Sequence, residues 1–371
     1  MITPGDEYPL HQTSRPVRDP GTDRNLYDRF FFNGYPHVGE DRGNMFFAVA
    51  FGTYPGRNVV DGACTVIDGG IQYNVRGSRL MGDDRLDLRC GPVTVEIVEP
   101  LHQLRVIVDD PDSGVSADLL FTSRAAPFEE PHFRFGPGHR LIMDITRLTQ
   151  NGTWSGHIVT PQRRIEVLDD SWWGCRDRSW GFRMTGERDS VAAPDGVENA
   201  GYYWLWAPLN FDDEVVIFDV NELPSGRRWH ENTMVARVGA SANEAVDGTH
   251  TYQIEWKPGT RHAAKFTADL ALDNGRSERI TLTPLLTFFM SGIGYGHPTW
   301  GHGMWVGHDE RSHDSLVLAD VDESNLLYNH VQILCEATRG SGGNVGMGIL
   351  EMLIIGPHTP SGLVEIFDMH A

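Results

Sequence analysis

Short segments in which apolar and polar residues alternate one by one recur along the chain and constrain its fold most strongly. Residues 93–97 and 104–108 both show this pattern. A period of two is typical of a half-buried strand. Further strands are predicted at residues 115–123, 139–148, 153–159, 162–168, 172–184, 201–209, 214–221, 229–238, 250–257, 263–272, 277–288, 300–307, 331–337 and 349–355. Helical periodicity is expected only near Leu26–Phe32, with a short turn near Glu323–Leu327. The chain is therefore predicted to be all-β.

The length of 371 residues is sufficient for two domains, and the 41 glycines and 21 prolines fit many short strands joined by tight turns. Strands at this spacing are expected to close into antiparallel barrels. The segment 186–199 has little that could pack and is the predicted boundary. We expect an N-terminal arm at residues 1–25, loosely held, a first barrel at 26–190 and a second at 200–371.

The formal net charge of −20 argues against nucleic acid or an anionic membrane surface as a partner. No run of apolar residues reaches the length of a membrane helix, and no signal peptide is expected. The four cysteines are scattered, which suits a reducing cytoplasm better than a disulfide framework. No cofactor is expected, because the sequence has no P-loop, no dinucleotide-binding turn and no paired-cysteine metal motif. The oligomeric state is left open.

The segment 172–183 holds three Trp, three Arg and one Asp in twelve residues. In a strand, Trp173, Cys175 and Asp177 share one face, and Arg176 and Arg178 share the other with Trp180. A carboxylate inside an apolar barrel is a candidate general acid, because desolvation disfavours its charged form. The alternative is that Asp177 belongs to a structural ion-pair network with the neighbouring arginines.

The segment 292–308 contains three histidines among glycines. A metal site is disfavoured, since His302 and His308 would lie about 20 Å apart along a strand. His302, with Trp300 or Trp305 near it, is instead a candidate for the lining of a ligand pocket, and Tyr295 and Trp300 are candidates for substrate contact. A structural histidine is the alternative.

Trp204 lies in an aromatic stretch, residues 202–206, that presents rings on both faces of a predicted strand. Such a stretch could form the wall of a hydrophobic ligand site. Core packing is the alternative.

The residues Arg176-Asp177-Arg178-Ser179-Trp180-Gly181 resemble the aspartate motif of the carotenoid 1,2-hydratase (hydroxyneurosporene synthase) superfamily. Asp, Trp and Gly of that motif match, whereas its histidines are replaced by Arg and its tyrosine by Cys175. The segments 149–156 and 297–303 are similar to an uncharacterised bacterial branch of the same superfamily. The resemblance implies two lipocalin-like barrels, a hydrophobic ligand, and an aspartate, here Asp177, that protonates an alkene.

These observations lead to one leading hypothesis and one rival. The chain is predicted to be a cofactor-independent lyase or isomerase, of the hydratase or cyclase type, acting on an apolar isoprenoid, steroid or aromatic molecule. Asp177 would donate the proton and His302 would position water. Trp173, Trp180 and Trp204 would surround the substrate and stabilise developing positive charge. The rival is a lipocalin-like carrier without catalysis.

Overall fold

The computed structural model describes residues 2–11, 23–136, 141–183, 201–340 and 343–370, which form two compact units. The described residues of the first unit are 2–11, 23–136, 141–183 and 292–320, and the remainder belong to the second. The predicted boundary at 186–199 lies outside the described residues. The late segment 292–320 thus joins the first unit, whereas the residues before and after it belong to the second.

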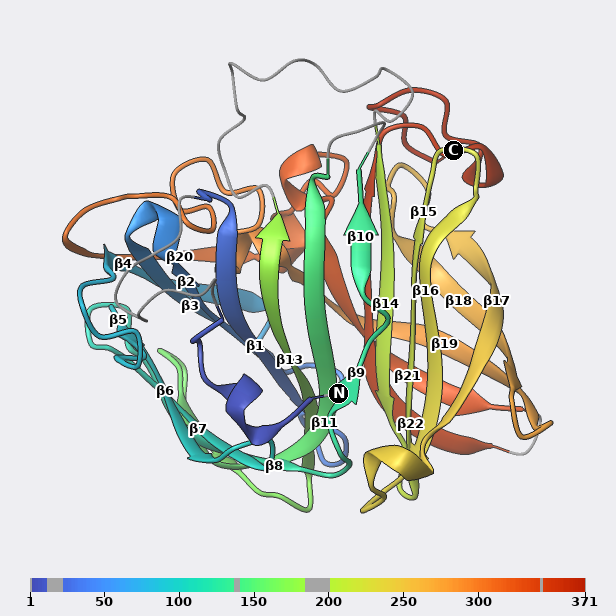
Figure 1. The fold of residues 1–371 in the computed structure, drawn as a ribbon, viewed down its shortest axis with the longest axis horizontal. Helices are drawn as coiled ribbons and strands as arrows, with labels where there is room; N and C mark the ends of the chain where they lie inside the picture. The colour runs from blue at the N-terminus through green and yellow to red at the C-terminus, as the bar shows by residue number, and fades with distance from the viewer. Residues whose placement is uncertain (1, 12–22, 137–140, 184–200, 341–342, 371) are drawn as a thin grey trace. The chain divides into compact units, whose positions relative to one another are not determined.

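The first unit is one antiparallel sheet of 14 strands that curls into a nearly closed barrel (Figure 1). Its main path runs in the order β20-β4-β3-β2-β1-β13-β11-β8-β7-β6-β5. The strands are β1 (Leu26–Pro36), β2 (Phe46–Tyr54), β3 (Val59–Asp68), β4 (Ile71–Leu80), β5 (Arg89–Cys90), β6 (Val93–Glu99), β7 (Gln103–Asp110), β8 (Val115–Ser123), β9 (Phe128–Glu129), β10 (Phe133–Phe135), β11 (Met143–Val159), β12 (Arg164–Val167), β13 (Trp172–Arg183) and β20 (Asp309–Val317).

The second unit is a closed antiparallel barrel of eight strands. These are β14 (Tyr202–Asn210), β15 (Glu214–Glu222), β16 (Arg228–Arg237), β17 (Val246–Trp256), β18 (Ala263–Leu272), β19 (Ser277–Phe289), β21 (Val331–Arg339) and β22 (Asn344–Ile355). The prediction of an all-β protein built from two barrel-like sheets is confirmed.

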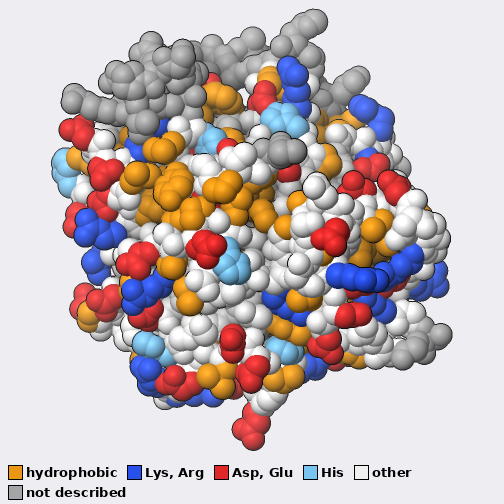
Figure 2. Space-filling view, turned by 60° about the horizontal axis from the view of Figure 1, so that its bottom comes forward, with side chains coloured by type: hydrophobic (Ala, Val, Ile, Leu, Met, Phe, Trp, Pro, Cys, Tyr) orange, Lys and Arg blue, Asp and Glu red, His pale blue; other side chains and the backbone are white. Residues whose placement is uncertain are grey.

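The helices of the described chain are single 3₁₀ turns: η1 (Pro4–Glu7), η2 (Pro55–Arg57), η4 (Ala242–Glu244), η5 (Met290–Ile293), η6 (Leu318–Asp320), η7 (Leu326–Tyr328) and η8 (Thr359–Ser361). In the described ranges, no helix has the length and apolar character needed to cross a bilayer. On the face shown in Figure 2, acidic and basic side chains are interspersed.

Two sequence predictions of secondary structure are wrong. The segment Leu26–Phe32 is not a helix but the start of β1, whose eleven residues are all buried between β2 and β13. A strand buried on both faces loses its alternation and cannot be told from a buried helix by periodicity. The segment 300–307 is a loop, because Gly303 adopts a left-handed φ of 67°, and the strand begins only at Asp309.

The core of the first unit contains one face of β1, with Phe30 and Phe32, and the indole of Trp154 on β11. The Trp154 ring centroid lies 5.9 Å from that of Phe32 and 5.0 Å from that of Phe47, in edge-to-face contacts. The Trp154 Nε1–H donates to the Asn33 carbonyl at 2.9 Å, so the indole is satisfied although it is fully buried. The side chains on the opposite face of β1, which include Arg29, do not belong to this core.

The N-terminal arm differs from the loosely held segment that was expected. Glu7 is fully buried, and its carboxylate accepts two hydrogen bonds from the guanidinium of Arg176, at 2.8 and 2.7 Å. His11 stacks on Trp180 with ring centroids 3.9 Å apart and bonds Asp28 at 3.0 Å. Residues 2–11 are thus anchored to the first unit by a buried ion pair.

Candidate active site

A row of paired residues crosses the first sheet on the face opposite the core. Asp61 of β3 pairs with Gly52 of β2, Gly52 with Arg29 of β1, and Arg29 with Ser179 of β13. Directly paired residues of an antiparallel sheet share a face. Since Phe30 points to the core, Arg29 and the residues of its row lie on the other side.

The segment 292–308 is held on this face by contacts with β3 and β4. The Arg76 Nε–H donates to the Gly292 carbonyl at 2.9 Å, and the Gly303 N–H donates to Asp61 Oδ2 at 2.7 Å. A Cβ on Gly292 would overlap the side-chain oxygen of Asn74, so only glycine allows this approach. β20, which follows the segment, then pairs along the edge strand β4.

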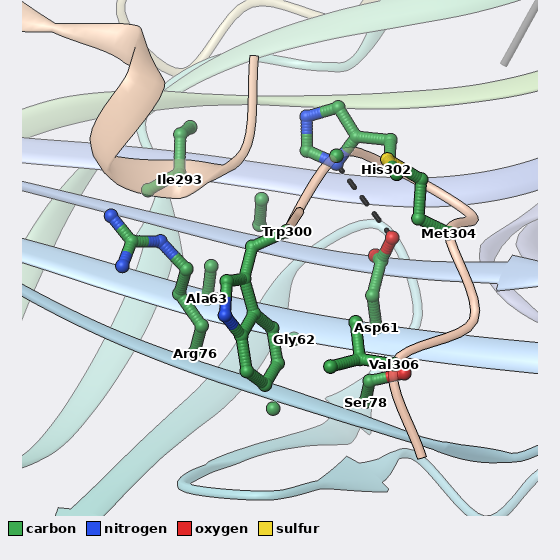
Figure 3. Close-up of a pocket in the computed structure, with 13 residues that line it drawn as sticks. Asp61, Gly62, Ala63, Arg76, Ser78, Ile293, Trp300, His302, Met304 and Val306 are labelled. Atoms are coloured by element: carbon green, nitrogen blue, oxygen red, sulfur yellow. Dashed lines mark ion pairs between the residues drawn. The ribbon is translucent and has the colours of Figure 1, made fainter. Parts of the chain in front are cut away.

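His302 is the ionisable group that the segment 292–308 brings to Asp61 (Figure 3). Its Nδ1 lies 3.8 Å from Asp61 Oδ2, and its imidazole is 11% exposed. Its ring packs edge-on against that of Tyr295, with centroids 4.5 Å apart. The other ring nitrogen, Nε2, is buried and has no hydrogen-bond partner among the residues that the structure describes. Burial, followed by the nearby charge of Arg29, lowers the pKa of His302 to about 3, so the imidazole is neutral at pH 7.

Arg29 is a buried cation whose side chain has few hydrogen bonds. Its Nη1–H donates to the Tyr295 hydroxyl at 2.8 Å, and its guanidinium lies 4.8 Å from the centroid of that ring. Its Nε and Nη2 are buried without hydrogen-bond partners among the described residues. Burial alone would lower the pKa of Arg29, but neighbouring phenol groups raise it, so Arg29 stays charged.

A small cavity lies between the segment 292–308 and the sheet (Figure 3). Asp61, Arg76, Ser78 and His302 contribute its polar lining, and Trp300 contributes an aromatic wall. Its free space is sufficient for about one water molecule. Two of the predicted site residues, His302 and Trp300, are thus brought to one cavity, and Tyr295 packs against His302.

Asp177 lies in the next row of the same face. It pairs with Phe31 of β1, which pairs with Ala50 of β2, a residue that lines the cavity. Two strand spacings correspond to about 10 Å between the Asp177 and Ala50 backbones. Burial raises the pKa of the Tyr27 hydroxyl, and Asp177 and Tyr295 both contribute to the electrostatic field there. Asp177 and Tyr295, a residue of the segment that carries His302, therefore both lie near enough to Tyr27 to act on its hydroxyl.

The arginines beside Asp177 lie on the opposite face of β13, as strand parity predicts. Arg176 bonds Glu7, and Arg178 forms an ion pair with Asp28. Both guanidinium groups are fully buried, and they lie over aromatic rings of the barrel core. The structure differs from expectation in one respect: the arginine face, rather than the Asp177 face, points into the barrel.

Two predicted substrate-binding residues share the Asp177 face of β13. The Cys175 thiol is buried and donates to Asn33 Oδ1 at 3.3 Å. Trp173 is buried and stacks on the imidazole of His37, with centroids 3.6 Å apart. Both side chains therefore pack against residues of the first unit, Cys175 against Asn33 and Trp173 against His37.

Two other predicted substrate-binding residues lie elsewhere. Trp180 occupies the arginine face of β13, where it stacks on His11. Trp204 belongs to β14 of the second unit, where its Nε1–H donates to Glu351 Oε1 at 3.1 Å. Trp180 is therefore on the opposite side of β13 from Asp177.

The three histidines of the segment 292–308 have separate environments. The Nδ1 of His297 accepts the backbone N–H of Trp300 at 3.0 Å, whereas the ring of His308 packs edge-on against Trp305 at 5.3 Å. His302 alone of the three faces Asp61.

Sequence reasoning missed Asp61 and Arg29. Asp61 stands in the apolar run Val59–Cys64, and a single carboxylate in such a strand was a usable signal. Arg29 was hidden in the segment mistaken for a helix. Their convergence with His302 depends on pairings between residues more than 200 positions apart, which periodicity does not reveal.

The profile of a family described as "Family of unknown function (DUF8625)" matches residues 2–364. No curated protein matches the sequence significantly. Among solved structures, a provisionally assigned AttH from Nitrosomonas europaea aligns with a TM-score of 0.54 and 13% identity, over 88% of this chain and 92% of that one. Kievitone hydratase from Nectria haematococca aligns with a TM-score of 0.51 and 11% identity, over 88% of each chain. At these identities, the likeness shows a shared fold.

Proposed function

We propose that this chain, which belongs to the family of unknown function DUF8625, is a cofactor-independent lyase of the hydratase type. The observation that carries the proposal is the neutral, buried imidazole of His302, held against Asp61 beside a space for one water. The fold shared with a hydratase supports the same class of reaction.

In the proposed reaction, His302 is the general base and Asp61 is its positioning residue. Asp61 faces Nδ1 and favours the tautomer that carries a proton there, which leaves a lone pair on Nε2. Asp61 would also stabilise the imidazolium formed when water gives up a proton. The imidazole is neutral at rest and can accept a proton, but the burial that keeps it neutral also makes it a weak base.

Asp177 is proposed as the acid that supplies the second proton. It lies on the same face as the cavity, at about two strand spacings from it. Addition of water to a double bond needs a base at one carbon and an acid at the other, so two groups on one face fit the reaction. A substrate larger than water would need the segment 292–308 to move away from the sheet. Tyr295 and Trp300 belong to this segment, so they would then contact the substrate.

The substrate is proposed to be an apolar isoprenoid, steroid or aromatic molecule with a double bond. Trp173 lies on the face of Asp177, and Trp300 lines the cavity, so both are candidates for contact with it. The cytoplasmic location remains part of the proposal.

The test is incubation of the full chain with a panel of such alkenes in H₂¹⁸O, followed by mass spectrometry. We expect a product heavier by one labelled water, and its loss in His302→Gln and in Asp177→Asn. His308→Gln, an exposed histidine of the same segment, is the matched control and should retain full turnover. A protein that binds panel members equally in all variants without turnover would instead be a carrier.

A further inference from the structure

Arg29 differs from Arg176 and Arg178, two other buried arginines of the first unit, in what its side chain contacts. Arg176 is bound by the carboxylate of Glu7 through two hydrogen bonds and by Gln150 through a third. Arg178 forms an ion pair with Asp28. Arg29 is just as deeply buried, but within the described residues its side chain hydrogen-bonds only the hydroxyl of Tyr295.

Among the described residues, Arg29 hydrogen-bonds no carboxylate, although the charge of Asp61 acts on it, and a buried cation in such a setting is unfavourable in a resting protein. Water solvates a guanidinium better than a phenol ring can, and two of the donor groups of Arg29 make no hydrogen bond. Such a cost is tolerated where a ligand completes the interaction, which is common at functional sites. The chemistry that matches two free N–H groups of a guanidinium is an oxygen atom that carries negative charge.

The position of Arg29 fits a role in the same reaction as His302. Gly52 separates Arg29 from Asp61 in their row, and the Tyr54 hydroxyl and the Asp61 carboxylate lie over it, where a Cβ would meet them at 2.6 and 2.9 Å. Tyr295 contacts Arg29 through its hydroxyl and His302 through its ring. The cation and the proposed base are therefore joined by one residue and lie on one face.

We propose that Arg29 binds the carbonyl oxygen of an α,β-unsaturated ketone, aldehyde or ester and stabilises the enolate that forms when water adds to its double bond. This inference rests on the proposed hydratase function and names its substrate class. It assigns Arg29 as a catalytic residue that contacts the substrate oxygen.

The reaction is balanced for water alone. His302 Nε2 takes one proton from water as the water oxygen bonds to the β-carbon. The electron pair of the double bond moves to the carbonyl oxygen, which becomes the enolate oxygen on Arg29. Protonated Asp177 then gives a proton to the α-carbon and the carbonyl re-forms. The proton on His302 returns to Asp177 through solvent, so no oxidant or reductant is consumed.

The electrostatics favour this route over protonation of an isolated alkene. A carbocation would form beside a buried guanidinium, and the two positive charges would repel. An enolate has the opposite effect. Its negative charge offsets the positive charge of Arg29, which is one of the causes that lower the pKa of His302. The imidazole therefore becomes a stronger base as the enolate forms.

The first test compares two substrate panels in H₂¹⁸O: conjugated enones and enoate esters, and matched isolated alkenes. We expect hydration of the conjugated panel and a fall in kcat of about 10²–10³ in Arg29→Met, the range for loss of an oxyanion donor. Arg29→Lys keeps the positive charge but loses the paired N–H donors of the guanidinium. Its kcat should lie between those of the wild type and Arg29→Met. Arg311→Met, an exposed arginine of β20, is the matched control and should be unchanged.

The second test needs no turnover and keeps the inference open to refutation if Arg29→Met does not fold. Titration of the full chain with 4-nitrophenol should give the absorbance spectrum of bound phenolate at a pH where the free phenol is protonated. Arg29→Lys should weaken this shift, and His302→Gln should retain it.

The outcomes separate the two proposals. Hydration of isolated alkenes only would leave the hydratase function standing and overturn the role of Arg29. A phenol that binds in its neutral form would also overturn that role. If neither panel reacts but the phenolate binds through Arg29, the oxyanion site stands and the hydratase function falls.

Discussion

Substitution of Glu7 tests whether the N-terminal arm is an integral part of the first unit. The Glu7 carboxylate accepts two hydrogen bonds from Arg176, at 2.8 and 2.7 Å, and one from the Leu101 N–H at 2.8 Å. Glu7→Gln leaves the Arg176 charge buried without a counter-charge. Removal of one partner of a buried pair costs about 3–5 kcal/mol, and we expect the free energy of unfolding to fall by that amount at pH 7.

The assay is urea unfolding followed by tryptophan fluorescence, since Trp180 stacks on His11 of the same arm. Asp6→Asn is the matched control, because its carboxylate is 27% exposed and the change should cost less than about 1 kcal/mol. The double variant Glu7→Leu/Arg176→Met should cost less than Glu7→Gln, because no charge is left unpaired. A loss below about 1 kcal/mol in Glu7→Gln would refute the buried pair.

The same pair sets an expected pH dependence. Burial alone would raise the pKa of Glu7, but the charge of Arg176 outweighs it, and the pKa lies below its usual value. The stabilisation is therefore present above the pKa of the unfolded chain and is lost as the pH falls through the lower, folded value. The unfolding free energies of wild type and Glu7→Gln should converge in that acid range.

Three other predictions concern the site. Because the pKa of His302 is about 3 in the fold against 6.5 unfolded, the unfolded chain binds more protons between these values, and stability should fall by at most about 5 kcal/mol as the pH drops through that window. His302→Gln should remove this slope in urea titrations, and an unchanged slope would contradict the burial of the imidazole. Gly303→Ala places a Cβ against the Tyr54 ring at a left-handed φ, and should lower the free energy of unfolding by about 2 kcal/mol in the same assay; a neutral effect would argue against this loop conformation. Arg76→Met removes the ion pair to Asp314 and should speed amide hydrogen exchange in β20 relative to β21, whereas equal exchange would show that β20 is held by its backbone pairing alone.

The period-two pattern was sufficient to predict the fold class and most strands. The segments 115–123 and 263–272 coincide with β8 and β18 because one face of each is buried and the other is not. The pattern failed where that asymmetry is lost, as in β1, which is buried on both faces.

The candidate site was only partly accessible to sequence reasoning. Asp177 and Arg176 are neighbours in a strand, so their side chains must lie on opposite faces of it, and the structure shows this arrangement. Which face points to the core does not follow, because the carboxylate that binds Arg176 belongs to Glu7, a residue 169 positions away. The partnership of His302 with Asp61 depends on long-range pairing in the same way, since the loop that carries His302 reaches β3 only when β20 has paired with β4.

The placement of β20 at the edge of β4 affects how the chain is made. β4 ends at Leu80 and its partner begins at Asp309, so the ribosome needs about 10 to 50 s to deliver the partner at typical rates. During this interval β4 is an unpaired edge, open to association with other nascent chains. Most of the second barrel emerges before the first sheet gains its last strand and the loop with His302. A ribosome that stalls before residue 302 would release a chain that lacks both β20 and the proposed base, His302.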